Sequence, residues 1–206
     1  MDKRPYGTQP VKGRKMKRIM EYTDKRTRRT VHLIQTTTLQ MLCGQRIDEI
    51  RIIDLCGKAD INRTTFYLHF RGITDVLDAL HEEIVERIFT QETVSFDFSK
   101  PFEAIEFLNA CSSVLASYKH LDSFLCHSED ADYFLSGLKN RFCKKLDLIH
   151  KERVHTSAEA CYVIRFLASG MLDTYVQWLK TDRKIPLQEV FSSCAPIIEA
   201  GRALLV

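Results

Sequence analysis

The residues with the clearest chemistry lie in one short segment, residues 54–70, which reads DLCGKADINRTTFYLHF. Five side chains with hydrogen-bond donors follow one another within it: Arg63, Thr64, Thr65, Tyr67 and His69. Arginine can make two hydrogen bonds to the edge of a guanine, and hydroxyl, phenol and imidazole groups suit phosphate oxygens. The segment therefore predicts a surface that binds double-stranded DNA.

Two short helices are expected to position these donors, one over residues 52–58 and one over residues 63–69. The turn Ala59-Asp60-Ile61 separates them, and Asn62 is a suitable N-cap for the second helix. Two helices joined in this way form a helix-turn-helix, whose second helix lies in the major groove of DNA. The apolar positions predicted to pack the core of this unit are Leu55, Ala59, Ile61, Phe66 and Phe70.

This segment resembles the TetR family of transcriptional regulators, and the resemblance covers about residues 25–88. The matching positions are, in order, Ile52, Leu55, Ala59, Ile61, Asn62, Arg63, Thr65, Phe66, Tyr67, His69 and Phe70. The resemblance implies an all-α homodimer with a three-helix DNA-binding domain over residues 24–70. It also implies a C-terminal helical domain over residues 71–206 that dimerises and responds to an effector.

The resemblance also implies which residues contact DNA. From the second helix these are Asn62, Arg63, Thr64, Thr65, Tyr67, Leu68 and His69, with Leu68 suited to a thymine methyl group. Two flanking positions depart from the family pattern. Arg51 stands where the family commonly has Thr or Ser, and it can still meet a phosphate. At the start of the fourth helix the family often has Lys, and here Arg71 or Thr74 is expected to substitute for it.

The charge distribution is uneven along the chain, although the net charge is only +3. Residues 1–30 hold eleven Lys and Arg against three Asp and Glu, and the remainder is mildly acidic. This layout suits a polyanion at the N-terminal end, or else a solvated tail. Residues 1–23 are predicted to be a flexible basic tail, with a helix from Asp24 to Gly44. The phosphate-seeking cluster in the tail is Arg14, Lys15, Lys17 and Arg18.

The rest of the chain also reads as helical. With 8 Gly and 5 Pro in 206 residues, tight turns are few, and no segment alternates as a strand would. A ligand pocket is predicted from aromatic residues, although aromatics at helical spacing are more often core: Phe102, Phe107, Tyr118, Phe124, Phe134, Phe142, Tyr162 and Phe166. The run 158–179 is apolar on more than one side. Its second face is predicted to pair with a second subunit through Gly170, Tyr175 and Trp178.

Several other classes of protein are disfavoured. The seven cysteines form no CxxC motif, and no phosphate-binding loop, metal-ligand pattern or catalytic motif is present. We expect no catalytic, metal or cofactor site, no membrane span and a cytoplasmic location. The predicted function is a repressor that binds a palindromic operator as a dimer and is released by an effector. Two alternatives stay open, namely an activator or co-regulator controlled by a protein partner, and an all-α enzyme or protein-binding module.

Overall fold

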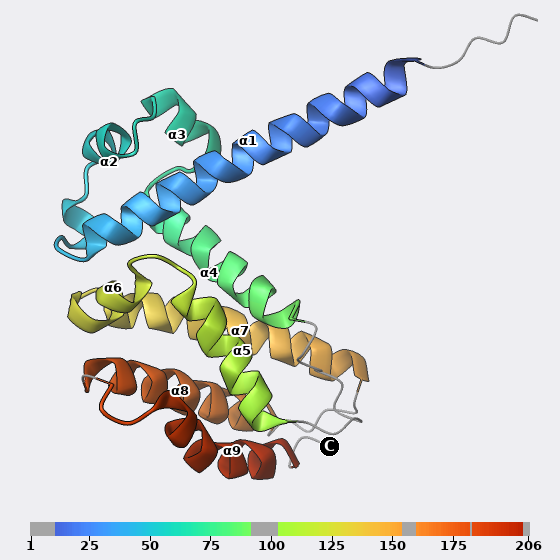
Figure 1. The fold of residues 1–206 in the computed structure, drawn as a ribbon, viewed down its shortest axis with the longest axis vertical. Coiled ribbons are helices and arrows are strands. Elements are labelled where there is room, and N and C mark those ends of the chain that lie inside the picture. Colours follow the sequence, from blue (N-terminus) through green and yellow to red (C-terminus); the bar gives the residue numbers. More distant parts are fainter. Residues whose placement is uncertain (1–10, 92–102, 154–159, 182, 204–206) are drawn as a thin grey trace, which may run out of the picture.

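The structure is a computed structural model that describes residues 11–91, 103–153, 160–181 and 183–203. Every regular element in these ranges is a helix, which confirms the predicted all-α class (Figure 1). The elements are α1 (Val11–Leu42), the 3-10 helix η1 (Ile47–Glu49), α2 (Ile52–Lys58), α3 (Arg63–His69), α4 (Ile73–Phe89), α5 (Ala104–Ala116), α6 (Leu121–His127), α7 (Ala131–Arg153), α8 (Ala160–Lys180) and α9 (Leu187–Ala203). No helix in the described ranges is long and apolar enough to cross a membrane.

Helix α1 begins at Val11, well before the predicted start at Asp24, so the prediction of a flexible tail is wrong for residues 11–23. A single glycine at position 13 costs a helix only about 1 kcal/mol, and most of residues 14–22 (RKMKRIMEY) are good helix formers. In Figure 1 the first half of α1 extends away from the rest of the molecule. The basic cluster therefore lies on a helical segment: Arg14, Lys15, Lys17 and Arg18.

One continuous apolar core joins the N-terminal helices to the C-terminal ones. It includes Ile34 of α1, Phe66 of α3 and Leu80 of α4, and it extends to Leu179 at the end of α8. Helix α4 carries one apolar stripe at helical spacing, and the stripe is buried along its whole length: Ile73, Val76, Leu77, Leu80, Ile84 and Ile88. Helix α4 thus connects the helix-turn-helix to the C-terminal helices, both through the chain and through the core.

Helix α4 is fastened to α7 by charged side chains as well as by apolar ones. Asp78 and Glu82 both pair with Arg141, at 3.0 and 3.4 Å, and Glu86 pairs with Lys145. The acidic residues recur every four positions on α4 and the basic residues are four apart on α7, so both sets lie on facing sides of their helices. These pairs lie along the contact between the two helices and add to its apolar packing.

Helices α5 to α9 form the remainder of the C-terminal part. Helix α7 packs against α4 and α8, and α9 packs against α5 and α8. A proline inside a helix is expected to kink or split it, but α9 continues through Pro196. Pro196 and Ser192, whose carbonyl loses its helical partner, both lie on the exposed side, where solvent can satisfy that carbonyl. The sequence also suggests a loop over residues 90–100, a helix start at Pro101 and a capping box over residues 156–159. These segments fall wholly or largely outside the described residues.

Candidate nucleic-acid interface

The turn between α2 and α3 is held by a compact set of hydrogen bonds. The Ala59 amide donates to the Leu55 carbonyl at 2.9 Å, and the Ile61 amide donates to the Cys56 carbonyl at 3.0 Å. Asp60 takes a left-handed conformation with a φ of 51°, which Asp tolerates better than most residues. These bonds and this conformation set the angle between the two helices, as the predicted turn requires.

Helix α3 begins and ends where the sequence predicted. The Asn62 side chain accepts a hydrogen bond from the Thr64 amide at 2.7 Å and so caps the helix. Phe66 is fully buried, and its ring lies 5.5 Å from Tyr67 and 5.9 Å from Phe70. This anchor fixes which side of the short helix faces the core and which side faces outward.

The outward side of α3 carries four of the predicted contact residues at positions i, i+1, i+4 and i+5: Arg63, Thr64, Tyr67 and Leu68. All four are exposed, Tyr67 at 51% and Leu68 at 75%. Arg63 is exposed, and its guanidinium makes no ion pair with any residue that the structure describes. The four residues form a continuous surface of donors around one apolar side chain, which we call the α3 face.

The flanking predicted residues differ in their availability. Thr65 and His69 are half-buried beside the α3 face, and Thr74 is exposed near the start of α4. Arg71 is exposed, and its amide donates to Asp75 at 2.9 Å, which caps the start of α4. These positions continue the surface from α3 onto α4.

Arg51 is exposed but is already paired within its own helix. Its Nε and Nη2 atoms donate to the two carboxylate oxygens of Asp54 at 2.6 and 3.0 Å. The hydrogen bond to Asp54 raises the pKa of Arg51 above its usual value. A phosphate at this position would therefore have to share or displace Asp54, which sequence spacing alone did not indicate.

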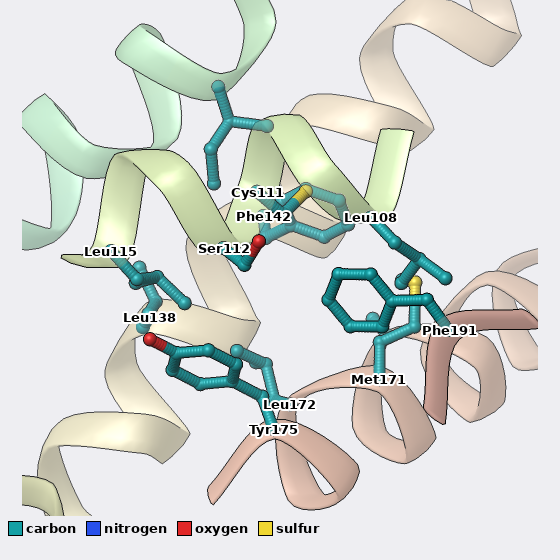
Figure 2. Close-up of a pocket in the computed structure, with 12 residues that line it drawn as sticks. Leu108, Cys111, Ser112, Leu115, Leu138, Phe142, Met171, Leu172, Tyr175 and Phe191 are labelled. Atoms are coloured by element: carbon teal, nitrogen blue, oxygen red, sulfur yellow. The ribbon is translucent and has the colours of Figure 1, made fainter. Parts of the chain in front are cut away.

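A small cavity is lined by residues of α4, α5, α7, α8 and α9 (Figure 2). Its volume is about 50 Å³, and its lining is almost entirely apolar: Ile88, Leu108, Cys111, Ser112, Leu115, Leu138, Phe142, Ala168, Met171, Leu172, Tyr175 and Phe191. No charged side chain is among them. Because these residues come from five helices, no spacing within one segment could have identified them.

Of the eight aromatic residues predicted to line a pocket, only Phe142 lines this cavity. Four others are buried in the core instead: Phe107, Tyr118, Phe124 and Phe134. Tyr118 also donates to Glu83 at 2.9 Å, and burial raises its pKa to about 12. Tyr162 and Phe166 lie on the surface, exposed at 73% and 74%, and Phe102 lies outside the described residues.

Helices α8 and α9 present an exposed apolar surface, which we call the α8–α9 face. Its most exposed side chains are Tyr162, Phe166 and Ile197. A groove of about 200 Å³ runs between Phe166 and Ile197 and passes Gly170. A Cβ atom at Gly170 would meet nothing within 4 Å in the described part of the chain, so space is open there. At about 100° per residue, these α8 positions share one side of the helix.

The predicted placement of Tyr175 and Trp178 on that side is corrected by their contacts. Tyr175 is buried and donates to Asp122 of α6 at 3.3 Å. Trp178 is half-buried and donates through Nε1 to the Ile185 carbonyl at 2.8 Å. Because α8 is apolar around most of its circumference, the sequence did not show which residues face its own chain.

Comparisons with known proteins bear on the fold. No protein-family model matches the sequence, and no curated protein matches it either. Among solved structures, the chain is similar to a TetR-family transcriptional regulator from Streptomyces coelicolor, with a TM-score of 0.55 and 16% sequence identity. The similarity covers 86% of this chain and 82% of that chain. The helices of this protein are therefore arranged in a TetR-like all-α fold.

Proposed function

We propose that this protein is a DNA-binding transcriptional regulator that reads the major groove with α3. The observation that carries this proposal is the α3 face, where the exposed Arg63, which makes no ion pair with a described residue, lies beside Thr64 and Tyr67 on a helix anchored by Phe66. Arginine discriminates guanine, and Tyr67 suits a phosphate oxygen. The exposed Leu68 costs free energy in water and is suited to the methyl group of a thymine.

The proposal includes a homodimer formed through the α8–α9 face. Large apolar side chains are seldom clustered on the surface of a monomer, and Phe166 and Ile197 flank an open groove at Gly170. A second copy of the same face would bury them around a two-fold axis. The same axis would relate the two DNA-binding domains (residues 24–70), which we call the heads. Two heads related in this way suit a palindromic operator.

We also propose that an effector acts through the apolar cavity and releases a repressor from its operator. The lining excludes charged partners, so the effector would be an uncharged, largely apolar molecule. A volume of about 50 Å³ is well below the 300 Å³ or more of usual ligand pockets. Binding would therefore require side chains such as Met171 and Leu172 to move, which couples occupancy to the packing of α8.

Helix α1 supplies a basic extension to the same end of the molecule. Lys25, Arg26 and Arg29 are exposed on it, and its first half extends away from the body (Figure 1). We propose that this segment attracts phosphates without regard to base sequence.

Salt-dependent binding to a mixed-sequence DNA duplex tests the proposal. Each phosphate contact should lower the slope of log affinity against log salt by about 0.9. Arg63→Glu should weaken binding strongly, whereas Lys144→Glu makes the same charge change at an exposed site of α7 and should not. Deleting residues 1–20 should flatten the slope. Binding that ignores salt, or equal losses in the two Glu variants, would contradict the proposal.

A further inference from the structure

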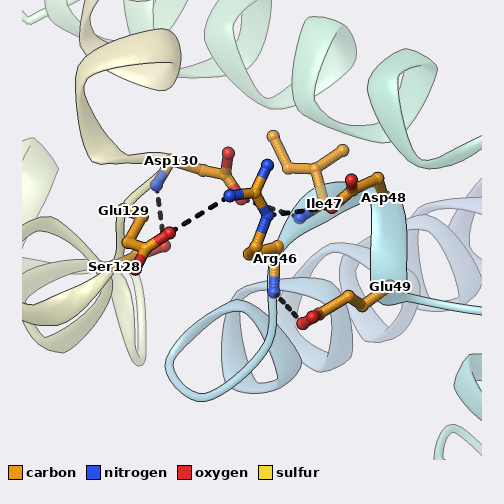
Figure 3. Close-up of polar contacts among 7 residues, drawn as sticks. All are labelled: Arg46, Ile47, Asp48, Glu49, Ser128, Glu129 and Asp130. Carbon is orange, nitrogen blue, oxygen red and sulfur yellow. Dashed lines mark hydrogen bonds and ion pairs between the residues drawn. The ribbon is translucent and has the colours of Figure 1, made fainter.

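The corner between α1 and α2 is attached to the C-terminal helices at a second point, the turn between α6 and α7 (Figure 3). The backbone amide of Ile47 donates to the Asp130 carboxylate, with 2.7 Å between Ile47 N and Asp130 Oδ2. The guanidinium of Arg46 reaches Glu129 of the same turn at 3.2 Å. Residues 70–72 link the head covalently to helices α4–α9, which we call the body. This link lies at the other end of the head (Figure 1).

Asp130 is held firmly in place by its own helix. Its amide donates to the Ser128 hydroxyl at 3.2 Å, and its carbonyl accepts from the Phe134 amide at 3.1 Å in the first turn of α7. Phe134 is fully buried. The Asp130 side chain therefore extends from a fixed backbone, and its hydrogen bond from the Ile47 amide is short.

Among the described residues, two weaker polar contacts accompany the Ile47–Asp130 bond: the Arg46–Glu129 pair, and a hydrogen bond from the Cys43 thiol, a weak donor, to the His120 carbonyl at 3.7 Å. The Arg46 and Glu129 side chains are 54% and 77% exposed, and exposed pairs of this kind contribute little. The apolar packing of α1 against α4 and α6 is not directional and allows small rotations. A hydrogen bond constrains both distance and angle.

A restraint on η1 passes directly to α3. The Arg46 amide donates to the Glu49 carboxylate at 2.9 Å, which holds η1 as a single turn. Buried Ile50 follows immediately, and α2 begins two residues later. Helix α2 is in turn joined to α3 by the hydrogen-bonded turn described above. The orientation of the α3 face therefore depends on where Asp130 holds Ile47.

We propose that Asp130 is a positioning residue that fixes the orientation of the DNA-binding head against the body. This inference rests on the proposed function. In a dimer that joins two bodies, the orientation of each head sets the distance and rotation between the two α3 helices. Asp130 thereby sets the half-site spacing that the dimer accepts. Without this bond each head pivots about residues 70–72, and the dimer tolerates operators of altered spacing.

Two variants of Asp130 separate this role from the stability of α7. Asp130→Ser retains a good N-cap residue, but its hydroxyl is too short to reach Ile47. Asp130→Asn keeps the length and an acceptor oxygen, so it should preserve the attachment and behave as the conservative rescue. Thermal unfolding of both full-length variants checks that α7 remains folded.

The test combines amide hydrogen exchange with DNA binding. The probes are a palindromic duplex selected from random DNA by the wild-type chain, and the same duplex with one base pair inserted at its centre. The insertion rotates one half-site by about 35°. It should weaken wild-type binding about tenfold, as a mismatched base pair does, and Asp130→Ser binding at most about threefold. Exchange of the Ile47 amide should accelerate in Asp130→Ser and stay close to wild type in Asp130→Asn.

Each outcome bears on a different part of the proposal. Faster exchange with an unchanged spacing penalty would show that Asp130 holds Ile47 without setting the spacing, and it would overturn the inference while leaving DNA binding intact. Unchanged exchange in Asp130→Ser would also overturn it. A wild-type chain that binds no duplex would overturn the proposed function, and this inference with it.

Discussion

The α3 face and the α8–α9 face are both exposed, but they differ in chemistry and in origin. The α3 face surrounds one Leu with donors from a single seven-residue helix. The α8–α9 face places Phe166 and Ile197 beside an open groove between two helices. A donor-rich surface suits a hydrated polyanion, whereas an apolar one suits a dry contact with another protein surface. The two faces therefore indicate two different partners, DNA and a second copy of the chain.

The largest expected effect comes from placing a charge on the apolar face. Phe166→Asp should weaken the dimer by about 100-fold or more, because a central aromatic contact is lost and a carboxylate would be buried without a partner. The monomer should stay folded, since Phe166 is exposed within its own chain. Sedimentation velocity measures the change. Tyr133→Asp is the matched control on α7, also at an exposed aromatic, and it should leave assembly unchanged.

The corresponding change on the α3 face should affect DNA binding and leave the dimer intact. Arg63→Ala should cost about 1–3 kcal/mol of operator binding and relax the base preference at one position. Fluorescence anisotropy with the selected operator and with point-substituted operators measures both effects. If Arg63→Ala binds every duplex as the wild type does, α3 is not the element that reads sequence.

A third prediction concerns His81 of α4, the helix that connects the helix-turn-helix to the C-terminal helices. His81 is buried between α4 and α7 beside Phe134, and its Nε2 has no hydrogen-bond partner in the described part of the chain. Burial, with a smaller contribution from Arg141, lowers the pKa of His81 to about 4. In the unfolded chain the pKa is near 6.5, so below that pH the unfolded state binds a proton that the folded state does not.

Acidification should therefore destabilise the fold between about pH 6.5 and 4, and His81 should account for about 2 kcal/mol of the loss from pH 7 to pH 5. His81→Leu should remove this share of the pH dependence, whatever its own effect at pH 7. Urea unfolding of both chains at each pH provides the measurement. Parallel losses of stability in the two proteins would show that His81 is not responsible.

The smallest effect is expected for one phosphate contact on the α3 face. Tyr67→Phe removes a hydroxyl but keeps the ring beside Phe66, so the fold should not change. Binding should weaken by about 1 kcal/mol, to the same extent for operator and unrelated duplexes. Anisotropy titrations on both duplexes test this. A loss confined to the operator would instead make Tyr67 a base-reading residue.

The head could be predicted closely because its signals are local. Asn62 marks the start of α3, the turn residues mark the end of α2, and both helix boundaries agree with the structure. The start of α1 is harder to predict, because Gly13 is a weak helix former and only the helix-forming residues after it offset its cost. Arg51 pairs with Asp54, so its availability to a phosphate depends on that pair. The spacing of the two residues in the sequence did not reveal the pairing.

The C-terminal surfaces could not be predicted as well, because they depend on how distant helices meet. The cavity takes residues from five helices, and its predicted aromatic residues lie mostly in the core or on the surface. Helix α8 is apolar nearly all round, so its sequence could not show that Tyr175 faces Asp122 while Phe166 faces outward. Only the packing of α6 and α9 against α8 decides this.

The central claim is that a dimer presents two α3 faces to DNA. The most direct test is to let the full-length chain select the sites it binds from random duplex DNA. We expect an enriched palindrome whose half-site centres lie about one helical turn, or a multiple of it, apart. Enrichment of a single half-site without a repeat would contradict the dimer through the α8–α9 face. The absence of any enriched sequence would contradict the reading role of α3.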